Sequence, residues 1–537
     1  DVRHRSRDAV HIPEPDGKGA LLKVFATSVQ NDLHIVVEKS GEVCLDITRD
    51  ITPENILEEF VPVADLCDVK VCIRNVKGKQ MLSWEPEPDV IKEVPEPAKA
   101  ALDPKEVRTT EQLYLTGLHL EQYRHATYSA TDYYEEALRR DATDVRNNNA
   151  MGLWLIRKGQ FAKAEPYLRQ AVKTLTERNP NPYDGEPLYN LGLSLKYQGK
   201  TEEAYDSFYK ACWNAAWQDA GYYSLAQLSA ARGDWEEALY EIDKSLLRNW
   251  HNLRGRHLKA AILRHLGRKD EALALIEDSL RIDRFNFGCG FEKYLITRVE
   301  ADLKKLLALM RPEAHNYEEL ALDYASAGCW EEALMVAETA ISQNVSGQTM
   351  LHYYKSWFLI QLDRKEEALA AIREAEQQLP DCCFPNVLEA ILALQSVIGF
   401  AKETPKALYY LGNLWYDKRQ YPEAITCWET SMQQDDTFPT VLRNLSLAYF
   451  NKLNRQDEAV TLLEKAFALD MTDARILMEL DQLYKRLNRS HEDRLAFLEK
   501  HKDIAFQRDD LYLEYVTLLN QLGQYEEAIR MIDARKF

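Results

Sequence analysis

The stretch YYLGNLWYDKRQYPEAITCW, from Tyr409 to Trp428, consists of two amphipathic segments separated by a break at Arg419-Gln420. Apolar residues recur at helical spacing before the break, and Tyr421 and Ala424 begin a second apolar face after it. A single pair of helices cannot bury both of its apolar faces alone. The stretch therefore predicts a helix-turn-helix unit that has to stack on similar neighbours.

The second half of this stretch recurs along the chain as a short phrase that ends in alanine. The phrase appears as GQFAKA, GKTEEA, GDWEEA, GRKDEA, GCWEEA and GQYEEA, and without its glycine as DRKEEA, RQYPEA and NRQDEA. A degenerate copy, NRSHED, ends at Asp493, and the repeated alanines are Ala130, Ala164, Ala204, Ala238, Ala272, Ala333, Ala368, Ala424, Ala459 and Ala528. Successive copies are most often 34 or 35 residues apart, which is the period of tetratricopeptide repeats.

This period predicts a mainly α protein in which residues 105–537 form an α-solenoid of about 12 tetratricopeptide repeats. The three longer intervals predict departures from a regular array. An interval of 40 residues contains the insertion NPNPYDGE, one of 61 fits a divergent repeat near 286–310, and one of 56 adds a helix near 384–400. The last copy ends without a polar closing helix, so we expect the natural protein to continue beyond Phe537.

Residues 1–86 have a different character from the array. Short runs such as LLKVFATS, DLHIVVEK and DVKVCIR alternate apolar and polar residues, which predicts a small antiparallel β-sandwich. Within it, TPENILEEF predicts one short helix, with Thr52 as its N-cap and Pro53 at the first helical position. Residues 87–104 are rich in proline and glutamate and predict an extended linker.

The composition excludes several classes of partner. Asp and Glu number 86 against 67 Lys and Arg, and the net charge of −19 repels phosphate backbones, so we expect no nucleic acid partner. No apolar run reaches the roughly 18 residues that would span a bilayer, so we expect no membrane association. Nine cysteines without a CxxC pair indicate a reducing cytoplasm. The chain begins at Asp1 rather than Met, so the presence of a signal peptide stays open.

Catalytic and metal-binding patterns are absent from the sequence. It contains no GxSxG, no GxxxxGK[ST] and no HExxH. His251, His257 and His265 are spaced by six and eight residues, which does not place two ligands on one helical turn and indicates solvated or packed histidines. The adjacent Cys382 and Cys383 have a redox interpretation and a simpler one as small apolar residues. We therefore predict no catalytic residue, metal or cofactor for this chain, and leave open whether the full-length protein is an enzyme.

Several runs are similar to a known family. GLHLEQYRHAT, NPNPYDGEPLYNLGLSLKYQGK, YYLGNLWYDKRQYPEAI and QRDDLYLEYVTLLNQLGQYEEAI resemble those of large bacterial tetratricopeptide proteins of the YphG-like type. The resemblance extends over nearly the whole chain. It implies that the array is a downstream half, preceded by a β-rich region that resembles sugar-mutarotase-like sandwiches. Residues 1–86 would be the end of that upstream region, and the resemblance implies a carbohydrate-related setting. It brings no activity and no catalytic residues.

Partner binding is predicted on the concave face of the array, because solenoids expose long concave surfaces to extended partners. The phase of the repeats places these residues in the groove: Asn149, Arg157, Tyr189, Asn190, Lys196, Gln227, His257, Arg264, Tyr409, Asn413 and Arg443. The loops NPNPYDGE and DRFNFGCGFE are alternative recognition sites, or turns that only bend the chain. Their candidate residues are Asn181, Tyr183, Asp184 and Glu186 in the first loop, and Asp283, Arg284, Asn286 and Glu292 in the second.

Two functional hypotheses follow. The leading one is a non-catalytic interaction scaffold that binds a peptide or protein partner in the concave groove. The alternative is the accessory half of a carbohydrate-active or sugar-binding protein whose reacting groups lie upstream of this chain. The first predicts partner binding without turnover, and the second predicts sugar binding only in the longer protein.

Overall fold

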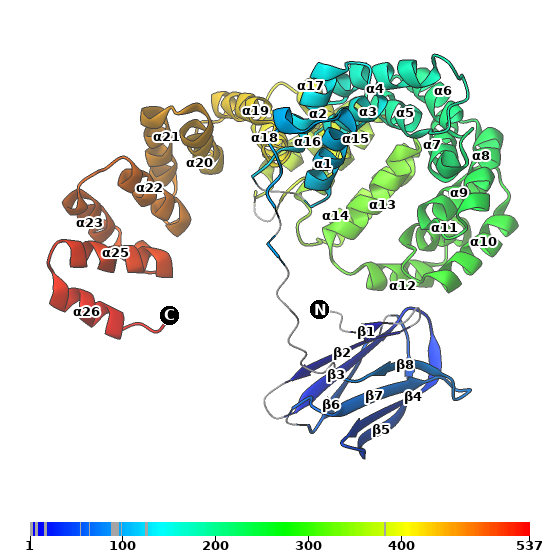
Figure 1. The fold of residues 1–537 in the computed structure, drawn as a ribbon, viewed down its shortest axis with the longest axis horizontal. Coiled ribbons are helices and arrows are strands. Elements are labelled where there is room, and N and C mark those ends of the chain that lie inside the picture. Colours follow the sequence, from blue (N-terminus) through cyan, green and yellow to red (C-terminus); the bar gives the residue numbers. More distant parts are fainter. Residues whose placement is uncertain are drawn as a thin grey trace.

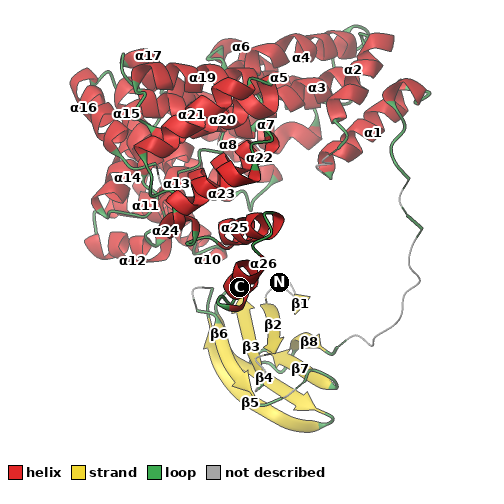
Figure 2. Cartoon of the chain, turned by 90° about the vertical axis from the view of Figure 1, so that its left-hand side faces the viewer, coloured by secondary structure: helices red, strands yellow, loops and turns green. Residues whose placement is uncertain are grey.

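The computed structural model describes most of the chain, and it describes side chains from residue 19 onward. The described residues are 4–5, 9–15, 19–53, 55–63, 65–86, 96–97, 99–123, 127–380 and 383–537. Figure 1 shows a group of strands at the N-terminal end, followed by a long array of helices. Figure 2 shows the same two parts coloured by secondary structure, with the strands in yellow and the helices in red.

Two four-stranded antiparallel sheets form the N-terminal part. One sheet has the order β1 (His4–Arg5), β2 (Ala9–Pro15), β3 (Ala20–Ala26) and β6 (Leu57–Val61), and the other β5 (Glu42–Ile51), β4 (Gln30–Lys39), β7 (Val69–Arg74) and β8 (Gln80–Trp84). Alternate side chains of β3 are buried, and Val24, Ile35 and Ile73 share a closed apolar core. The predicted small β-sandwich is confirmed.

The predicted helix in TPENILEEF is wrong. Thr52 and Asn55 form an isolated antiparallel bridge, and the following residues are strand β6. β6 pairs with β3, from Leu57 opposite Val24 to Val61 opposite Ala20, and Val61 is buried in the sandwich. A Thr-Pro helix start is a local signal, and strand pairing with a buried edge residue overrides it here.

Twelve helix pairs follow in the described residues, which confirms the predicted tetratricopeptide array of about 12 repeats (Figure 1). The pairs are α1 (Thr110–Gln122) with α2 (Ala130–Arg140), α3 (Val145–Arg157) with α4 (Phe161–Thr176), α5 (Glu186–Tyr197) with α6 (Thr201–Ala211), α7 (Gln218–Ala231) with α8 (Trp235–Arg248), α9 (Leu253–His265) with α10 (Lys269–Ile282), α11 (Phe287–Thr297) with α12 (Glu300–Met310), α13 (Ala314–Ser326) with α14 (Trp330–Ser342), α15 (Thr349–Gln361) with α16 (Lys365–Gln377), α18 (Pro405–Asp417) with α19 (Tyr421–Gln434), α20 (Pro439–Ala448) with α21 (Gln456–Leu469), α22 (Ala474–Arg486) with α23 (His491–Lys500), and α25 (Asp509–Gln521) with α26 (Tyr525–Asp533). Two helices stand outside the pairs, α17 (Glu389–Phe400) and the short α24 (Lys502–Ala505). The division into residues 1–86, 87–104 and 105–537 stays a prediction.

The repeated phrase marks the turn inside each pair and the first buried contact after it. Ala204 and Ala424 are both fully buried, because the second helix packs against the first at this point. Five positions earlier the backbone is left-handed, at Gly199 with φ of 73° and at Arg419 with φ of 60°. Glycine adopts this conformation without strain, whereas Arg419 adopts it only because the two packed helices impose the turn.

The degenerate copy NRSHED is shifted by one residue in the structure. Helix α23 begins after its N-cap Ser490, so Arg494, rather than Asp493, stands where the other repeats have alanine. Arg494 is buried and its guanidinium donates to Asp481 of α22, at 3.0 and 2.7 Å, and to Glu514 of α25, at 2.6 Å. A buried ion pair thus replaces the small residue of the other repeats.

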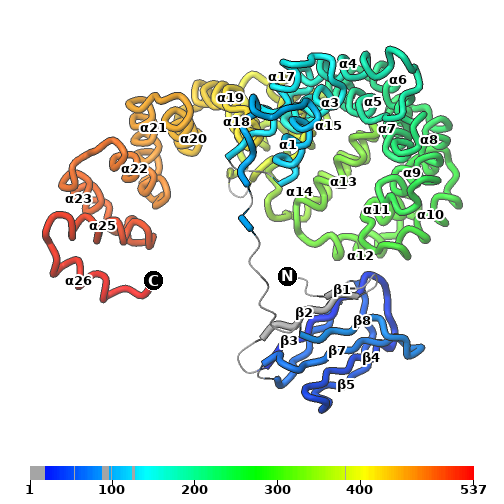
Figure 3. Tube along the Cα trace, in the orientation of Figure 1, coloured from blue at the N-terminus to red at the C-terminus, as the bar shows by residue number. Residues whose placement is uncertain are grey.

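The array closes one turn of its superhelix between α3 and α19, which we call the ring (Figure 3). Glu423 at the start of α19 accepts hydrogen bonds from Gln160, at 2.8 Å, and Lys163, at 3.0 Å, although Gln160 lies 263 positions away in the sequence. Glu389 of α17 accepts one from the hydroxyl of Tyr197 at 2.9 Å. The helices that follow the ring, α20 to α26, extend from it as a separate arm (Figure 1).

In the part of the chain that the structure describes, no helix combines the length and the apolar character that a membrane crossing requires.

Candidate functional site

Closure of the ring brings distant helices around one cavity of about 340 Å³, which we call the ring cavity. Side chains from α5, α7, α9, α13, α14, α15 and α17 line it. The residues that define its chemistry are Tyr189, Lys196, Tyr197, Tyr223, Gln227, Arg254, Asp323, Trp330, Trp357 and Glu389. The cavity is therefore a product of the superhelix and not of any single repeat.

Five aromatic side chains form its apolar walls. Trp330 and Trp357 meet edge to face with 5.4 Å between their ring centroids. Tyr189 stacks on Trp217 at 5.0 Å, and Tyr197 stacks on Phe161 at 4.6 Å. Ring pairs at these separations hold each other in place, so the walls are flat and rigid.

The polar groups in the ring cavity occur mainly as neighbouring donors and acceptors. The Lys196 ammonium group donates to Gln227 Oε1 at 2.7 Å. Arg254 lies between two carboxylates of α13, with 3.4 Å from its Nε to Asp323 Oδ1 and 2.5 Å from its Nη2 to Glu319 Oε2. These pairs present hydrogen-bonding groups of both kinds beside the aromatic walls.

Burial shifts the titration of two of these groups towards neutrality. It lowers the pKa of Lys196 to about 8, an effect that the negative charge of Glu389 partly offsets. It raises the pKa of Asp323 to about 7, and the Arg254 charge opposes the rise. The charges in the cavity are therefore held at a desolvation cost, which a ligand of suitable charge can reduce.

Two smaller cavities adjoin this site and share Arg254 and Asp323 with it. One has a volume of about 210 Å³, and the other, of about 10 Å³, lies against Tyr324 and Cys329. His257 lines both and its buried Nε2 has no hydrogen-bond partner among the described residues. Burial, together with the Arg264 and Arg254 charges, lowers the pKa of His257 to about 3, so its ring is neutral at pH 7.

The structure brings only some of the predicted groove residues together. Tyr189, Lys196 and Gln227 line the ring cavity, and His257 lines the two smaller ones. The other candidates contact neighbours within the array instead: Asn149 with Asn190, Arg157 with Glu121, Arg264 with Glu292 and Glu332, Tyr409 with Phe438, Asn413 with Asn444, and Arg443 with Glu479. These contacts support repeat stacking, and a role of these residues in a groove stays a prediction.

The two predicted loops differ in their exposure. In the first, Asn181, Tyr183 and Asp184 are exposed, and Asp184 accepts a hydrogen bond from the backbone of the part-buried Glu186, at the start of α5. Tyr183 is 96% exposed, so this loop is open to solvent.

The second predicted loop is partly helix, which corrects its interpretation as a loop. Asn286 is the buried N-cap of α11, and Glu292 lies inside that helix, where it is fully buried and paired with Arg264. Only Asp283 and Arg284 precede the helix, and Asp283 accepts from the backbone of Phe285 at 2.8 Å. Asn286, a candidate for recognition, thus has a structural role as the cap of α11.

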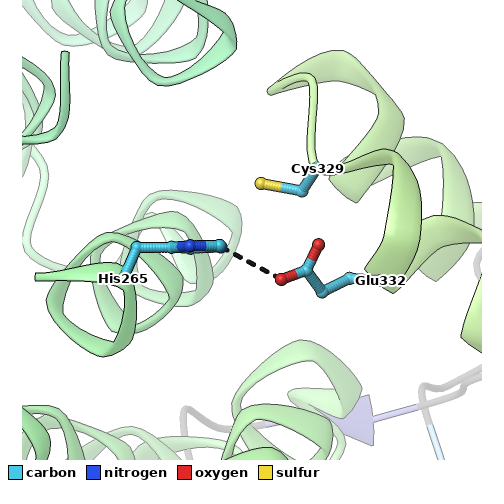
Figure 4. A group of neighbouring side chains, drawn as sticks. All are labelled: His265, Cys329 and Glu332. Carbon is cyan, nitrogen blue, oxygen red and sulfur yellow. Dashed lines mark ion pairs between the residues drawn. The ribbon is translucent and has the colours of Figure 1, made fainter. Parts of the chain in front are cut away.

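A group of His265, Cys329 and Glu332 has potential metal-ligand atoms within 4.8 Å of one another (Figure 4). Glu332 accepts from His265 Nε2 at 3.0 Å and from Arg264 at 2.7 Å. Burial alone would raise the pKa of Glu332, but the His265 hydrogen bond and the Arg264 charge lower it to about 2. Burial also raises the pKa of Cys329, which disfavours the thiolate that a metal requires. The Arg264 cation already balances this group, so we interpret it as an ion-pair network.

Several residues that line the ring cavity were not predicted from the sequence. Arg254, Asp323, Trp330, Trp357 and Glu389 line the cavity beside the predicted ones. The helical phase placed Tyr189, Lys196 and Gln227 on a concave face, but it could not show that α13 and α17 would lie opposite them. Only contacts between sequence-distant repeats carry that information.

The fold defines a class of protein, a tetratricopeptide-repeat protein with an N-terminal β-sandwich. Residues 7–84 match the family described as YphG-like protein, second domain, and residues 253–278 match the tetratricopeptide repeat. The chain thus carries a YphG-like second domain followed by tetratricopeptide repeats, which confirms the resemblance seen in its sequence.

A distant relative is the TPR repeat-containing protein YpiA of Bacillus subtilis (strain 168), 25% identical over 204 residues, which are 34% of this chain and 47% of that protein. The chain therefore spans about half the length of this relative. Among solved structures, it is similar to the MamA protein (20% identity, 32% of this chain and 91% of that chain, TM-score 0.29) and to Naa15/Naa10 bound to HypK-THB (14%, 79% and 68%, TM-score 0.26). A third is the TPR domain of P58(IPK), with 16% identity over 71% of this chain and 99% of that chain and a TM-score of 0.21.

Proposed function

We propose that this chain is a non-catalytic interaction scaffold that holds a peptide or protein partner against the concave side of its array. The observation that carries the proposal is the convergence of aromatic and hydrogen-bonding side chains from α5, α7, α13, α15 and α17 on the ring cavity. Rigid aromatic side chains contribute contact area at a small ordering cost, which favours binding of a partner's side chains or chain end.

The contacts within the cavity favour binding over turnover. Lys196 is held by Gln227, Arg254 by two carboxylates of α13, and Glu389 by the hydroxyl of Tyr197. Each of these groups has a structural partner that fixes its position. A scaffold uses such fixed groups to recognise a partner.

A second candidate function is the accessory half of a carbohydrate-active or sugar-binding protein. Two observations favour it. The YphG-like second domain precedes the array, and aromatic side chains that can stack against sugar rings line the ring cavity. The reacting groups would then lie upstream of residue 1.

We place this scaffold in the cytoplasm. All eight cysteines that the structure describes are free thiols, whereas Cys382, one of the adjacent pair, lies outside the described residues. A reducing compartment keeps such thiols free. The charge of −19 favours protein partners over nucleic acids and anionic membranes.

The test is site-specific photocrosslinking in cells that express the full chain. A benzophenone amino acid replaces Tyr223, which lines the ring cavity, and in a matched variant it replaces the exposed Tyr240 of α8. We expect a defined protein adduct from position 223 that position 240 does not give. The purified partner should then bind the Trp357→Ala variant at least tenfold more weakly than the unsubstituted chain. Adducts from both positions alike, or an affinity that Trp357→Ala leaves unchanged, would contradict the proposal.

A further inference from the structure

Lys196 carries a positive charge that its surroundings neutralise only in part. Its ammonium group donates to the neutral amide of Gln227, and among the described residues no carboxylate forms an ion pair with it. The nearest relevant acids are otherwise engaged: Glu389 accepts from Tyr197, and Asp323 lies beside Arg254.

A charge that is desolvated and only partly neutralised is costly for the folded protein. Desolvation penalises the ammonium form of Lys196, which is why burial lowers its pKa. The aromatic walls of Tyr189, Tyr223 and Trp357 supply little of the solvation that water would. A bound anion would provide the missing counter-charge, and the hydrogen bond between two charged groups is stronger than the one to Gln227.

The size and shape of the ring cavity indicate a small molecule for this position. Its volume of about 340 Å³ falls in the range of roughly 300–1,000 Å³ that is usual for small-molecule sites, and aromatic and polar side chains both line it. The aromatic side chains of Trp330 and Trp357 offer contact area for a ring-shaped ligand body. A segment in the middle of a partner chain would have to thread the closed ring, whereas a small molecule can diffuse into it.

The charges around the site limit the charge of the anion. One ammonium group faces the cavity without a counter-ion, while the carboxylates of Asp323 and Glu389 line the same cavity. A dianion such as a phosphate monoester would meet repulsion from both carboxylates. A single carboxylate satisfies Lys196 and leaves Arg254 with its own acidic partners.

We propose that the ring cavity is a binding site for a small cyclic monocarboxylate. Its carboxylate pairs with Lys196 and accepts a hydrogen bond from the ammonium group, while its ring lies among Tyr223, Trp330 and Trp357. The ligand would occupy the same ring cavity that carries the partner-binding proposal, but its binding requires no partner protein. A hydroxylated ring and an aromatic ring both fit this chemistry, and the probes below distinguish them.

The experiment is a titration of the protein with small molecules, measured by calorimetry, with the tryptophan fluorescence of the chain as a second readout. The probes are glucuronate and phenylacetate, each beside its neutral counterpart, glucose and 2-phenylethanol. We expect saturable binding of at least one carboxylate, and at least tenfold weaker binding of its neutral counterpart, because the charge on Lys196 selects the anion. Binding by glucuronate alone identifies a hydroxylated ring, and binding by phenylacetate alone an aromatic one.

Three variants test the residue. Lys196→Met should weaken carboxylate binding at least tenfold, and Lys196→Arg should retain most of it. Arg169→Met, which removes a half-exposed cation outside the cavity, should leave the binding unchanged. Thermal unfolding shows whether the Lys196→Met variant is folded. If it is not, the test rests on carboxylate binding by the charge-preserving Lys196→Arg variant and on the comparison with the neutral probes. Binding of neither carboxylate at millimolar concentration, or equal binding to folded Lys196→Met, would overturn the proposal. Because no partner protein is present, these results are independent of the crosslinking outcome.

Discussion

Replacing Arg494 by alanine is expected to destabilise the C-terminal arm, although alanine is the residue that the other repeats carry at this position. Arg494 is 2% exposed, and its guanidinium pairs with Asp481 and Glu514. The variant leaves the Asp481 carboxylate, which is 1% exposed, without its counter-ion between α22 and α23. Removing one partner of a buried ion pair costs about 3–5 kcal/mol.

The assay is hydrogen exchange resolved by helix, because long repeat arrays do not unfold in a single step. At 1.36 kcal/mol for each factor of ten, the expected loss corresponds to roughly 150- to 5,000-fold faster exchange through local opening. The faster exchange should appear in α22, α23 and α25. The helices of the ring should keep their protection.

Two matched variants separate the ion pair from a general packing effect. The double variant Arg494→Ala with Asp481→Ser reproduces the arrangement of the preceding pair, where Ser446 donates to the carbonyl of Ala459 at 2.6 Å. It should recover most of the lost protection. Arg508→Ala removes a half-exposed partner of Asp510 and should change stability by less than about 1 kcal/mol. An Arg494→Ala chain with exchange within tenfold of the original, or a double variant no better than the single one, would refute this reasoning.

Three further outcomes are expected. Gly159→Ala should open the ring, because a Cβ at Gly159 collides with residues of α17 and α18, and small-angle scattering should show a larger radius of gyration. The matched variant is Gly233→Ala, whose backbone is also left-handed but has open space around it. It should only lower the free energy of unfolding, by about 1 kcal/mol. The pKa of Glu332 is depressed to about 2, so its ionised form contributes roughly 3 kcal/mol to the free energy of unfolding above pH 4.5, and this contribution is lost as the pH falls towards 2. Denaturation measured at a series of pH values should therefore show a smaller loss of stability between pH 4.5 and 2 for Glu332→Gln than for the unsubstituted chain. Cys67 is exposed, whereas burial raises the pKa of Cys329, so a thiol reagent at pH 8 should modify Cys67 first; equal labelling rates in mass spectrometry would contradict the burial of Cys329.

The repeat unit could be predicted because its signals are local. The phrase around Ala424 combines a left-handed turn with the first buried contact of the second helix, and both lie within one pair. The strands of the sandwich were predictable from alternation for the same reason. β6 was missed because its strand conformation depends on pairing with β3, about 37 residues earlier in the chain.

The site was only partly predictable because it depends on the pitch of the superhelix. Small rotations between successive pairs accumulate until Gln160 meets Glu423, and a repeat pattern does not specify that sum. The sequence placed Tyr189 and Lys196 on the concave side, but their opposite wall, with Asp323 and Trp357, follows from closure. Asn286 and Glu292 were candidates for recognition because a polar N-cap and a buried ion-pair partner look the same in a sequence as exposed polar residues.

Closure of the ring also changes the cooperativity of unfolding. An open stack of repeats frays from its two ends, because each terminal repeat has a neighbour on one side only. The repeats between Gln160 and Glu423 have no such boundary, since the first and the last of them touch. Releasing one repeat from this closed set requires two interfaces to break together, whereas the arm loses its repeats one interface at a time. The ring should therefore melt as a single cooperative block, with the arm unravelling before it from its outer end.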